Sequence, residues 1–264
     1  MSGPVLAVIA LGPEGPERAS LEALALARGV AAAAGSAVEA VFLADATTAR
    51  SVAQSLAGRG ITRALVVEDA RLTVDHPDAW ATAIAQIATA RGAEAVVGAG
   101  TERGNDLLAR AAARLDVPMV ANCLTVEPGA TYAISRQRWA GSLIEECRLE
   151  ASTKVLTVAP NSVPAEAPDS SAAPTIEAAD VTITDADLAV HVTGREAPER
   201  GRISLTDAKV VVGGGRGVGS TEGFAELEEL AALLGGAVGG SRVVTSAGWR
   251  PHADQIGQTG LRIA

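Results

Sequence analysis

Short apolar runs alternate with longer stretches of helical periodicity along residues 5–115. The apolar runs are residues 5–10, 37–43, 64–67 and 95–97. Each run precedes a stretch in which apolar positions recur every three to four residues, namely 20–34, 47–57, 78–91 and 105–115. Strands that alternate with helices imply right-handed crossovers and a parallel sheet with helices on both faces. Trp80, Ile84 and Ile87 fall on one side of the third helix, so we expect them in the core.

The pattern changes after Pro118. Three apolar runs follow one another with turns between them and no room for helices, at residues 124–126, 131–134 and 143–149. We therefore expect an antiparallel segment at the edge of the parallel sheet, and then one more strand over residues 154–158. A stretch rich in Pro, Ala and Ser over residues 160–174 reads as a loop, and residues 175–193 contain two further alternating segments.

A polar stretch with Gly and Pro, GREAPERGRISL over residues 194–205, marks a candidate linker. It predicts an N-terminal domain over residues 1–200 and a smaller domain over residues 206–264 that starts near Thr206. The second domain should contain a strand at 209–212, a glycine turn and a helix at 222–234. A further loop and strand should follow, running from residues 237–239 through Ser241-Arg242 into residues 243–245. The helix should direct these apolar side chains inward: Phe224, Leu227, Leu230, Ala231 and Leu234.

The composition agrees with an α/β fold. Hydrophobic residues make up 48% of the chain and aromatic residues only 2%, so the core is built from Ala, Val, Leu and Ile, which is typical of helices packed on parallel strands. The fold class is therefore α/β, a Rossmann-like parallel sheet with an antiparallel segment followed by a smaller doubly wound domain. The formal net charge is −9 and no basic face is evident, which argues against a nucleic-acid partner.

The cysteines and histidines of the sequence predict neither a metal site nor a disulfide scaffold. Cys123 and Cys147 are too few and too far apart for a disulfide scaffold or zinc site, and the histidines (His76, His191, His252) share no ligand spacing. Reduced thiols indicate a cytoplasmic protein. The first residues carry no basic segment, and their apolar run stops at Gly12, so we expect neither a signal peptide nor a membrane insertion.

The candidate chemistry begins at KVVVGGGRGVGST, residues 209–221, where a strand breaks into glycines around one arginine. Backbone N–H groups of such a turn suit a phosphate. The motif is neither G-x-G-x-x-G nor a P-loop, because Val218 or Ser220 stands where those motifs need glycine or lysine. The simpler alternative is a tight connection between strand and helix. A second glycine loop, residues 98–104, is more readily explained by structure than by a ligand.

Three motifs then resemble a known family. Gly214-Gly215-Arg216-Gly217, Ser241-Arg242 within VGGSRVVTSAGW, and Gly257-Gln258-Thr259-Gly260, in this order, resemble the flavin domain of the electron-transfer flavoprotein alpha subunit. Residues 98–127 are similar to the strand, glycine loop, helix and antiparallel segment of that family's first domain. The resemblance extends over roughly the whole chain and includes the position of the linker.

The resemblance implies an electron carrier of the family's heterodimeric, FAD-containing kind, not an enzyme with its own substrate. Arg216 would lie near the FAD pyrophosphate, and Arg242 would lie against the isoalloxazine ring, where its charge favours a negatively charged reduced flavin. Ser241 would hydrogen-bond the cofactor, while Gln258 and Thr259 would bond ring nitrogens and oxygens. The implied partners are a beta subunit, flavin dehydrogenases as electron donors, and a quinone oxidoreductase or similar acceptor.

The sequence departs from the family pattern at its end. In the family, a strand, a histidine-containing helix and further polar residues follow the GQTG motif, and this sequence ends at Ala264. We therefore expect the flavin-binding domain to be incomplete. Two alternatives remain: an adenine-nucleotide-binding protein that uses residues 98–104, and a scaffold subunit that has lost flavin.

Overall fold

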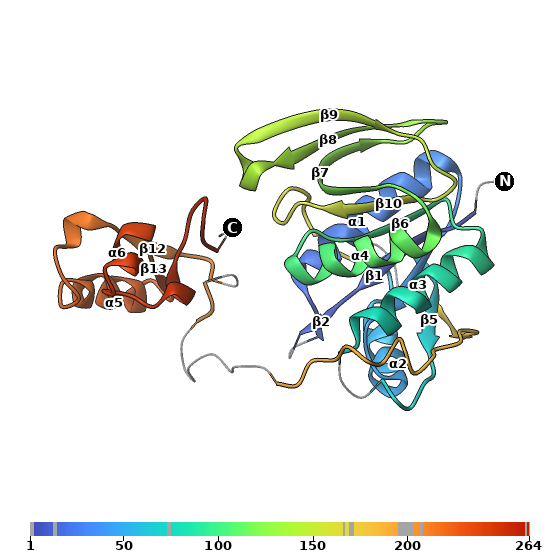
Figure 1. The fold of residues 1–264 in the computed structure, drawn as a ribbon, viewed down its shortest axis with the longest axis horizontal. Helices are drawn as coiled ribbons and strands as arrows, with labels where there is room; N and C mark the ends of the chain where they lie inside the picture. The colour runs from blue at the N-terminus through green and yellow to red at the C-terminus, as the bar shows by residue number, and fades with distance from the viewer. Residues whose placement is uncertain are drawn as a thin grey trace. The chain divides into compact units, whose positions relative to one another are not determined.

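The computed structural model describes residues 3–12, 15–72, 75–165, 167–168, 172–194, 203–205, 208–261 and 263. The chain forms two compact units, one of residues 1–138 and 143–193, the other of residues 139–142 and 194–264 (Figure 1). Most of the predicted linker at 194–205, together with Thr206, lies outside the described residues. Among the described residues, no helix is both long enough and apolar enough to cross a membrane.

The first unit is built on a nine-stranded sheet, and the fold class is α/β as predicted. Its strands are β1 (Val5–Ile9), β4 (Val38–Phe42), β5 (Ile61–Val67), β6 (Ala95–Ala99), β7 (Met119–Glu127), β8 (Tyr132–Arg138), β9 (Leu143–Leu149), β10 (Lys154–Val158) and β11 (Thr175–Ala179). Their order across the sheet is β11-β5-β4-β1-β6-β10-β7-β8-β9. All neighbouring pairs are parallel except β7–β8 and β8–β9, so the predicted antiparallel segment is present at one edge.

Helices cover both faces of the parallel part, as the alternation of strands and helices predicts (Figure 1). They are α1 (Arg18–Ala34), α2 (Ala46–Ser55), α3 (Pro77–Arg91) and α4 (Glu102–Leu115). Strand β1 shows the division, because Val5, Ala7 and Ile9 belong to the core with α1 and α2, whereas Leu6 and Val8 belong to the core with α3 and α4. Trp80, Ile84 and Ile87 of α3 are buried, as expected.

Two short strands, β2 (Leu11–Gly12) and β3 (Gly15–Pro16), form a small antiparallel pair before α1. The two alternating segments within residues 175–193 differ in structure. Only β11 forms there, and the residues after it lie along α3, where Thr182 exchanges two hydrogen bonds with Gln86 and Asp187 accepts one from Thr82. Side chains of α3 thus satisfy polar groups that a strand partner would otherwise satisfy, and Ile183 is buried.

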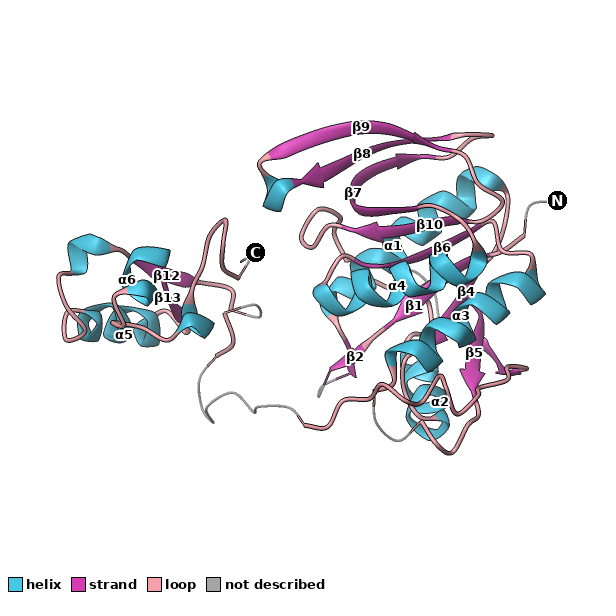
Figure 2. Ribbon diagram, in the orientation of Figure 1, coloured by secondary structure: helices cyan, strands magenta, loops and turns pink. Residues whose placement is uncertain are grey.

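The second unit contains a parallel pair of strands, β12 (Val211–Gly214) and β13 (Ala237–Gly240), drawn in magenta in Figure 2. Its other elements are η2 (Arg216–Val218), α5 (Phe224–Leu233), α6 (Arg242–Ser246) and η3 (His252–Asp254). The small core consists of Phe224, Ala231, Val238 and Val244, against which Trp249 packs. His252, at the start of η3, is exposed.

Two predictions for this unit are wrong. Residues 243–245 form part of helix α6 instead of a strand, because β13 ends at Gly240 and the Ser241 carbonyl accepts hydrogen bonds from the N–H groups of Val244 and Thr245. Leu230 and Leu234 are exposed, with 45% and 52% of their surface accessible. The two strands present a narrow face, so that α5 buries only Phe224 and Ala231 fully.

Candidate functional site

The two strands of the second unit bring the first two motifs together. Gly214 of β12 and Gly240 of β13 are register partners in a parallel pair, so the two strands end side by side, at the same end of the sheet. The Ser241 N–H donates to the Gly214 carbonyl at 2.9 Å. The turn that contains Arg216 therefore lies beside Ser241 and Arg242, at the carboxyl ends of parallel strands, where ligands of open α/β sheets bind.

The third motif lies on the other side of β13. Gln255 forms a parallel bridge with Gly240, and the Ile256 N–H donates to the Gly240 carbonyl at 2.9 Å. The chain then turns back, so that the Leu261 N–H donates to the Gln255 carbonyl at 2.7 Å. Gln258 and Thr259 are exposed in the turn between these bonds. All three motifs thus meet at one end of the sheet, although Arg216 and Thr259 are 43 positions apart in the sequence.

Close packing explains two of the glycines in these motifs. A Cβ on Gly214 would lie 2.5 Å from Cε1 of Phe224, and a Cβ on Gly240 would lie 2.7 Å from Cγ2 of Val244. The glycines let α5 and α6 approach the strand ends. In contrast, a Cβ on Gly217 would meet no heavy atom within 4 Å, so the middle of the turn is open.

The charges at this end of the sheet favour an anion. Arg216 and Arg242 are both exposed, and within the described residues neither guanidinium has an ion pair or hydrogen bond. A hydrogen bond from the Ser220 hydroxyl lowers the pKa of Glu222, whose carboxylate adds a negative charge beside the turn. The attraction for an anion therefore comes from the two arginines. Together with the Ser241 hydroxyl they form a donor set that fits a diphosphate and a polar ring, as FAD would require.

Sequence reasoning missed two buried polar residues of this site, Thr245 and Gln255. They are 3% and 7% exposed and are hydrogen-bonded to each other. No periodicity marks them, because their burial comes from the loop at 255–261 folding against α6. The burial of Gln255 beside the exposed GQTG turn can be seen only in the folded structure, because it depends on tertiary contacts.

The glycine loop at 98–104 in the first unit is explained by packing. A Cβ on Gly100 would lie 2.4 Å from the Val158 carbonyl oxygen, and one on Gly104 would lie 2.0 Å from the Ala99 carbonyl oxygen. Polar side chains around the loop bond one another, as Thr157 does in donating to Asn105 at 2.6 Å. These contacts support the structural interpretation of the loop over a nucleotide site.

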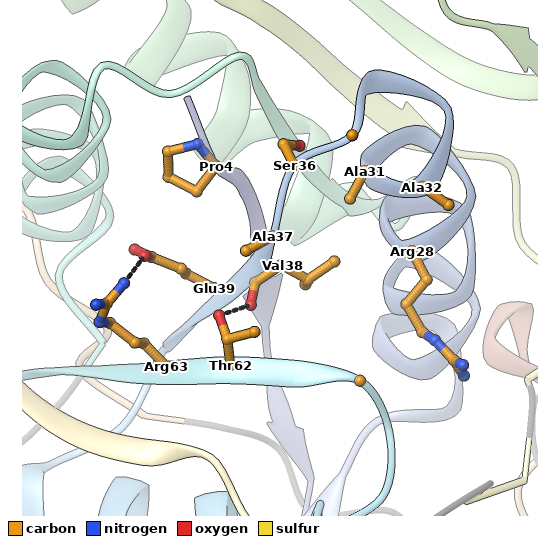
Figure 3. A pocket seen from close by; sticks show the side chains of 12 residues that line it. Pro4, Arg28, Ala31, Ala32, Ser36, Ala37, Val38, Glu39, Thr62 and Arg63 are labelled. Atoms are coloured by element: carbon orange, nitrogen blue, oxygen red, sulfur yellow. Dashed lines mark hydrogen bonds and ion pairs between the residues drawn. The ribbon is translucent and has the colours of Figure 1, made fainter. Parts of the chain in front are cut away.

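A shallow hollow of about 750 Å³ lies elsewhere in the first unit, between the C-terminal end of α1 and the amino ends of β4 and β5 (Figure 3). The amino ends of parallel strands are not where ligands of such sheets bind. Arg63 is turned toward Glu39 and forms an ion pair at 3.0 Å, and Arg91 binds the same carboxylate at 2.7 Å. These charged groups are satisfied within the protein, so we assign no ligand to the hollow.

Comparison with known proteins identifies two matching family models. Residues 5–184 match the electron transfer flavoprotein domain, and residues 204–264 match the electron transfer flavoprotein FAD-binding domain. The second match contains all three motifs described above, and the first covers the nine-stranded sheet.

Individual relatives agree with these matches. The chain is 32% identical over 212 residues to the electron transfer flavoprotein subunit alpha of Bacillus subtilis, a match that covers 80% of this chain and 65% of the relative. It is 34% identical to the subunit alpha of Paracoccus denitrificans, covering 85% and 70% of the two chains. Identity to the protein FixB of Clostridium saccharobutylicum is 34%, covering 80% and 64%. The chain thus spans about two thirds of the length of these relatives, and it belongs to the electron transfer flavoprotein alpha subunit family.

Proposed function

We propose that this chain is the FAD-holding subunit of a heterodimeric electron carrier. The observation that carries the proposal is the convergence of the three motifs at the carboxyl ends of β12 and β13, with two arginines that have no partner in the part of the chain that the structure describes. An exposed arginine without a protein partner keeps its full charge available for an anionic ligand. Because the binding groups belong to the second unit, we place the flavin-binding domain at residues 206–264 and the first domain at 1–200.

Each site residue has a role that follows from its chemistry. Arg216, in the open glycine turn, would share the negative charge of the FAD diphosphate with backbone N–H groups. Arg242 would place a fixed positive charge beside the isoalloxazine ring, and Ser241 would donate a hydrogen bond to the cofactor. Gln258 and Thr259 would offer an amide and a hydroxyl to polar atoms of the ring.

FAD, when bound, supplies one-electron chemistry, and the protein needs no general acid or base for it. The residues of the chain bind and orient the ring and set the charge around it. We propose a cytoplasmic beta subunit as the partner, flavin dehydrogenases as donors, and a quinone oxidoreductase or similar protein as the acceptor.

The edge of the sheet in the first unit supports the existence of a protein partner. Leu143 and Ile144 at the start of edge strand β9 are 55% and 57% exposed. Exposed apolar side chains on an unpaired strand edge are a liability unless another protein covers them.

Equilibrium dialysis of the chain, co-purified with its beta subunit, against FAD, AMP and ATP tests the proposal. We expect FAD to bind, and Arg216→Gln to weaken binding by at least about tenfold, because a hydrogen bond to a charged group contributes about 1.5–3 kcal/mol. Arg50→Gln is the matched control, since Arg50 lies on α2 in the first unit and pairs with Glu68. Binding of AMP or ATP alone would favour the adenine-nucleotide alternative, and no binding at all would favour the scaffold.

A further inference from the structure

Gln255 is a buried polar residue of the second unit that is held by several hydrogen bonds. Its backbone N–H donates to the His252 carbonyl at 3.0 Å, and its carbonyl accepts from the Leu261 N–H at 2.7 Å. The residue also bridges to Gly240, directly before Ser241 and Arg242. Only 7% of its surface is exposed. Gln255 is therefore fixed between the end of β13 and the turn that carries Gln258 and Thr259.

The side chain of Gln255 connects α6 to that turn. Its Oε1 accepts from the Thr245 hydroxyl at 2.7 Å. Its Nε2 lies 2.7 Å from the carbonyl oxygen of Thr259 and 2.9 Å from Oγ1 of the same residue. All the amide's polar atoms are satisfied by two threonines.

These contacts fix which group donates and which accepts in each hydrogen bond that links Thr245, Gln255 and Thr259. A backbone carbonyl can only accept, so the amide atom that faces the Thr259 carbonyl must be the nitrogen. The amide oxygen then faces Thr245, whose hydroxyl must donate to it. Because Gln255 also donates to Oγ1 of Thr259, the Thr259 hydroxyl hydrogen points away from Gln255. Thr259 is an exposed residue.

We propose that Gln255 is a positioning residue that makes the Thr259 hydroxyl a hydrogen-bond donor toward the flavin, with Thr245 holding the amide in place. This inference rests on the proposed function. A hydroxyl that donates to the ring binds it more tightly when the ring carries the added negative charge of reduction, so Gln255 should raise the flavin potential through Thr259. Without Gln255, the Thr259 hydroxyl is free to turn inward or to accept.

The test is a spectroelectrochemical titration of the chain bound to FAD and its beta subunit. Gln255→Met keeps the length of the side chain and removes both donor and acceptor. We expect it to reduce the preference for the reduced flavin by about tenfold, a shift of about 59 mV to more negative potential for a one-electron couple. Gln86→Met is the matched control, because Gln86 also makes two hydrogen bonds, to Thr182 in the first unit. It should leave the potential unchanged.

A double-mutant cycle with Thr259→Val separates positioning from general loosening of the domain. If Gln255 acts through Thr259, Gln255→Met should have no further effect on the potential once Thr259→Val is present. Additive shifts, or an unchanged potential in Gln255→Met with FAD still bound, would overturn the inference and leave the proposed function intact. Absence of FAD from the wild-type complex would overturn both.

Thr245→Val carries the same test if Gln255→Met does not retain FAD. It removes the donor that orients the amide while keeping the shape of the side chain and leaving the turn untouched. We expect a shift in the same direction and of smaller size, and this shift should also vanish in the Thr259→Val background. A Thr245→Val complex with the wild-type potential would count against the inference.

Discussion

Gly214→Ala tests how the packing of α5 fixes the turn that carries Arg216. The added methyl would lie 2.5 Å from Cε1 of Phe224 and 2.8 Å from Cδ1 of Leu227. Ordinary contact begins near 3.4 Å, so the Phe224 ring has to retreat by about 0.9 Å. Phe224 is only 2% exposed and lies in the core of the second unit, which leaves it no open space. Overpacking of this kind costs about 1–3 kcal/mol.

Hydrogen exchange followed by mass spectrometry can measure this loss of stability in the second unit separately from the first. We expect amides of α5 and β13 to lose protection by about 5–150-fold in Gly214→Ala, while amides of β1 and β6 stay unchanged. Gly217→Ala is the control for stability, because a methyl there meets no heavy atom within 4 Å and should change the free energy of opening by less than about 0.5 kcal/mol. Equal protection in Gly214→Ala and the wild type would refute the packing argument.

Three further predictions concern charge and thiol chemistry. Arg242→Ala should shift the potential of the bound flavin to more negative values, and an unchanged potential in a spectroelectrochemical titration would remove Arg242 from the ring. Burial raises the pKa of the Cys123 thiol to about 12, so iodoacetamide at pH 8 should label the half-buried Cys147 in the native protein well before Cys123; equal rates by mass spectrometry would contradict this. Hydrogen bonds from two arginines of α4, Arg114 most strongly and then Arg110, lower the pKa of Asp78 below its ordinary value of 3.8. The stabilisation is therefore complete at neutral pH and lost as the pH falls through the lowered value, so urea denaturation should show Asp78→Asn less stable by about 1 kcal/mol at pH 7 and no less stable near pH 2.

The sequence predicted the first unit well because its elements are locally consistent. Apolar runs of strand length, separated by helices of ordinary length, leave a parallel sheet as the arrangement that buries both faces. Residues 180–193 escaped prediction because an alternating pattern suits a strand as well as a segment packed on α3. Tertiary hydrogen bonds to Gln86 and Thr82 hold this segment along α3 instead of in a sheet.

Local preference misled the prediction in the second unit. Val243, Val244 and Thr245 are β-branched and favour a strand, yet a strand there would need a neighbour to pair with. As a helix, the same residues bury Val244 against the end of β13 and present Thr245 to Gln255. The motif residues could be recognised by their order along the chain, whereas the supporting role of Gln255 depends on contacts that the sequence does not display.

A crystal structure of the chain with its beta subunit and FAD tests the central claim most directly. The account predicts FAD at the carboxyl ends of β12 and β13, with its diphosphate near Arg216 and its ring between Arg242 and Thr259. FAD or a nucleotide bound instead at residues 98–104, with Arg216 and Arg242 free in solvent, would contradict it.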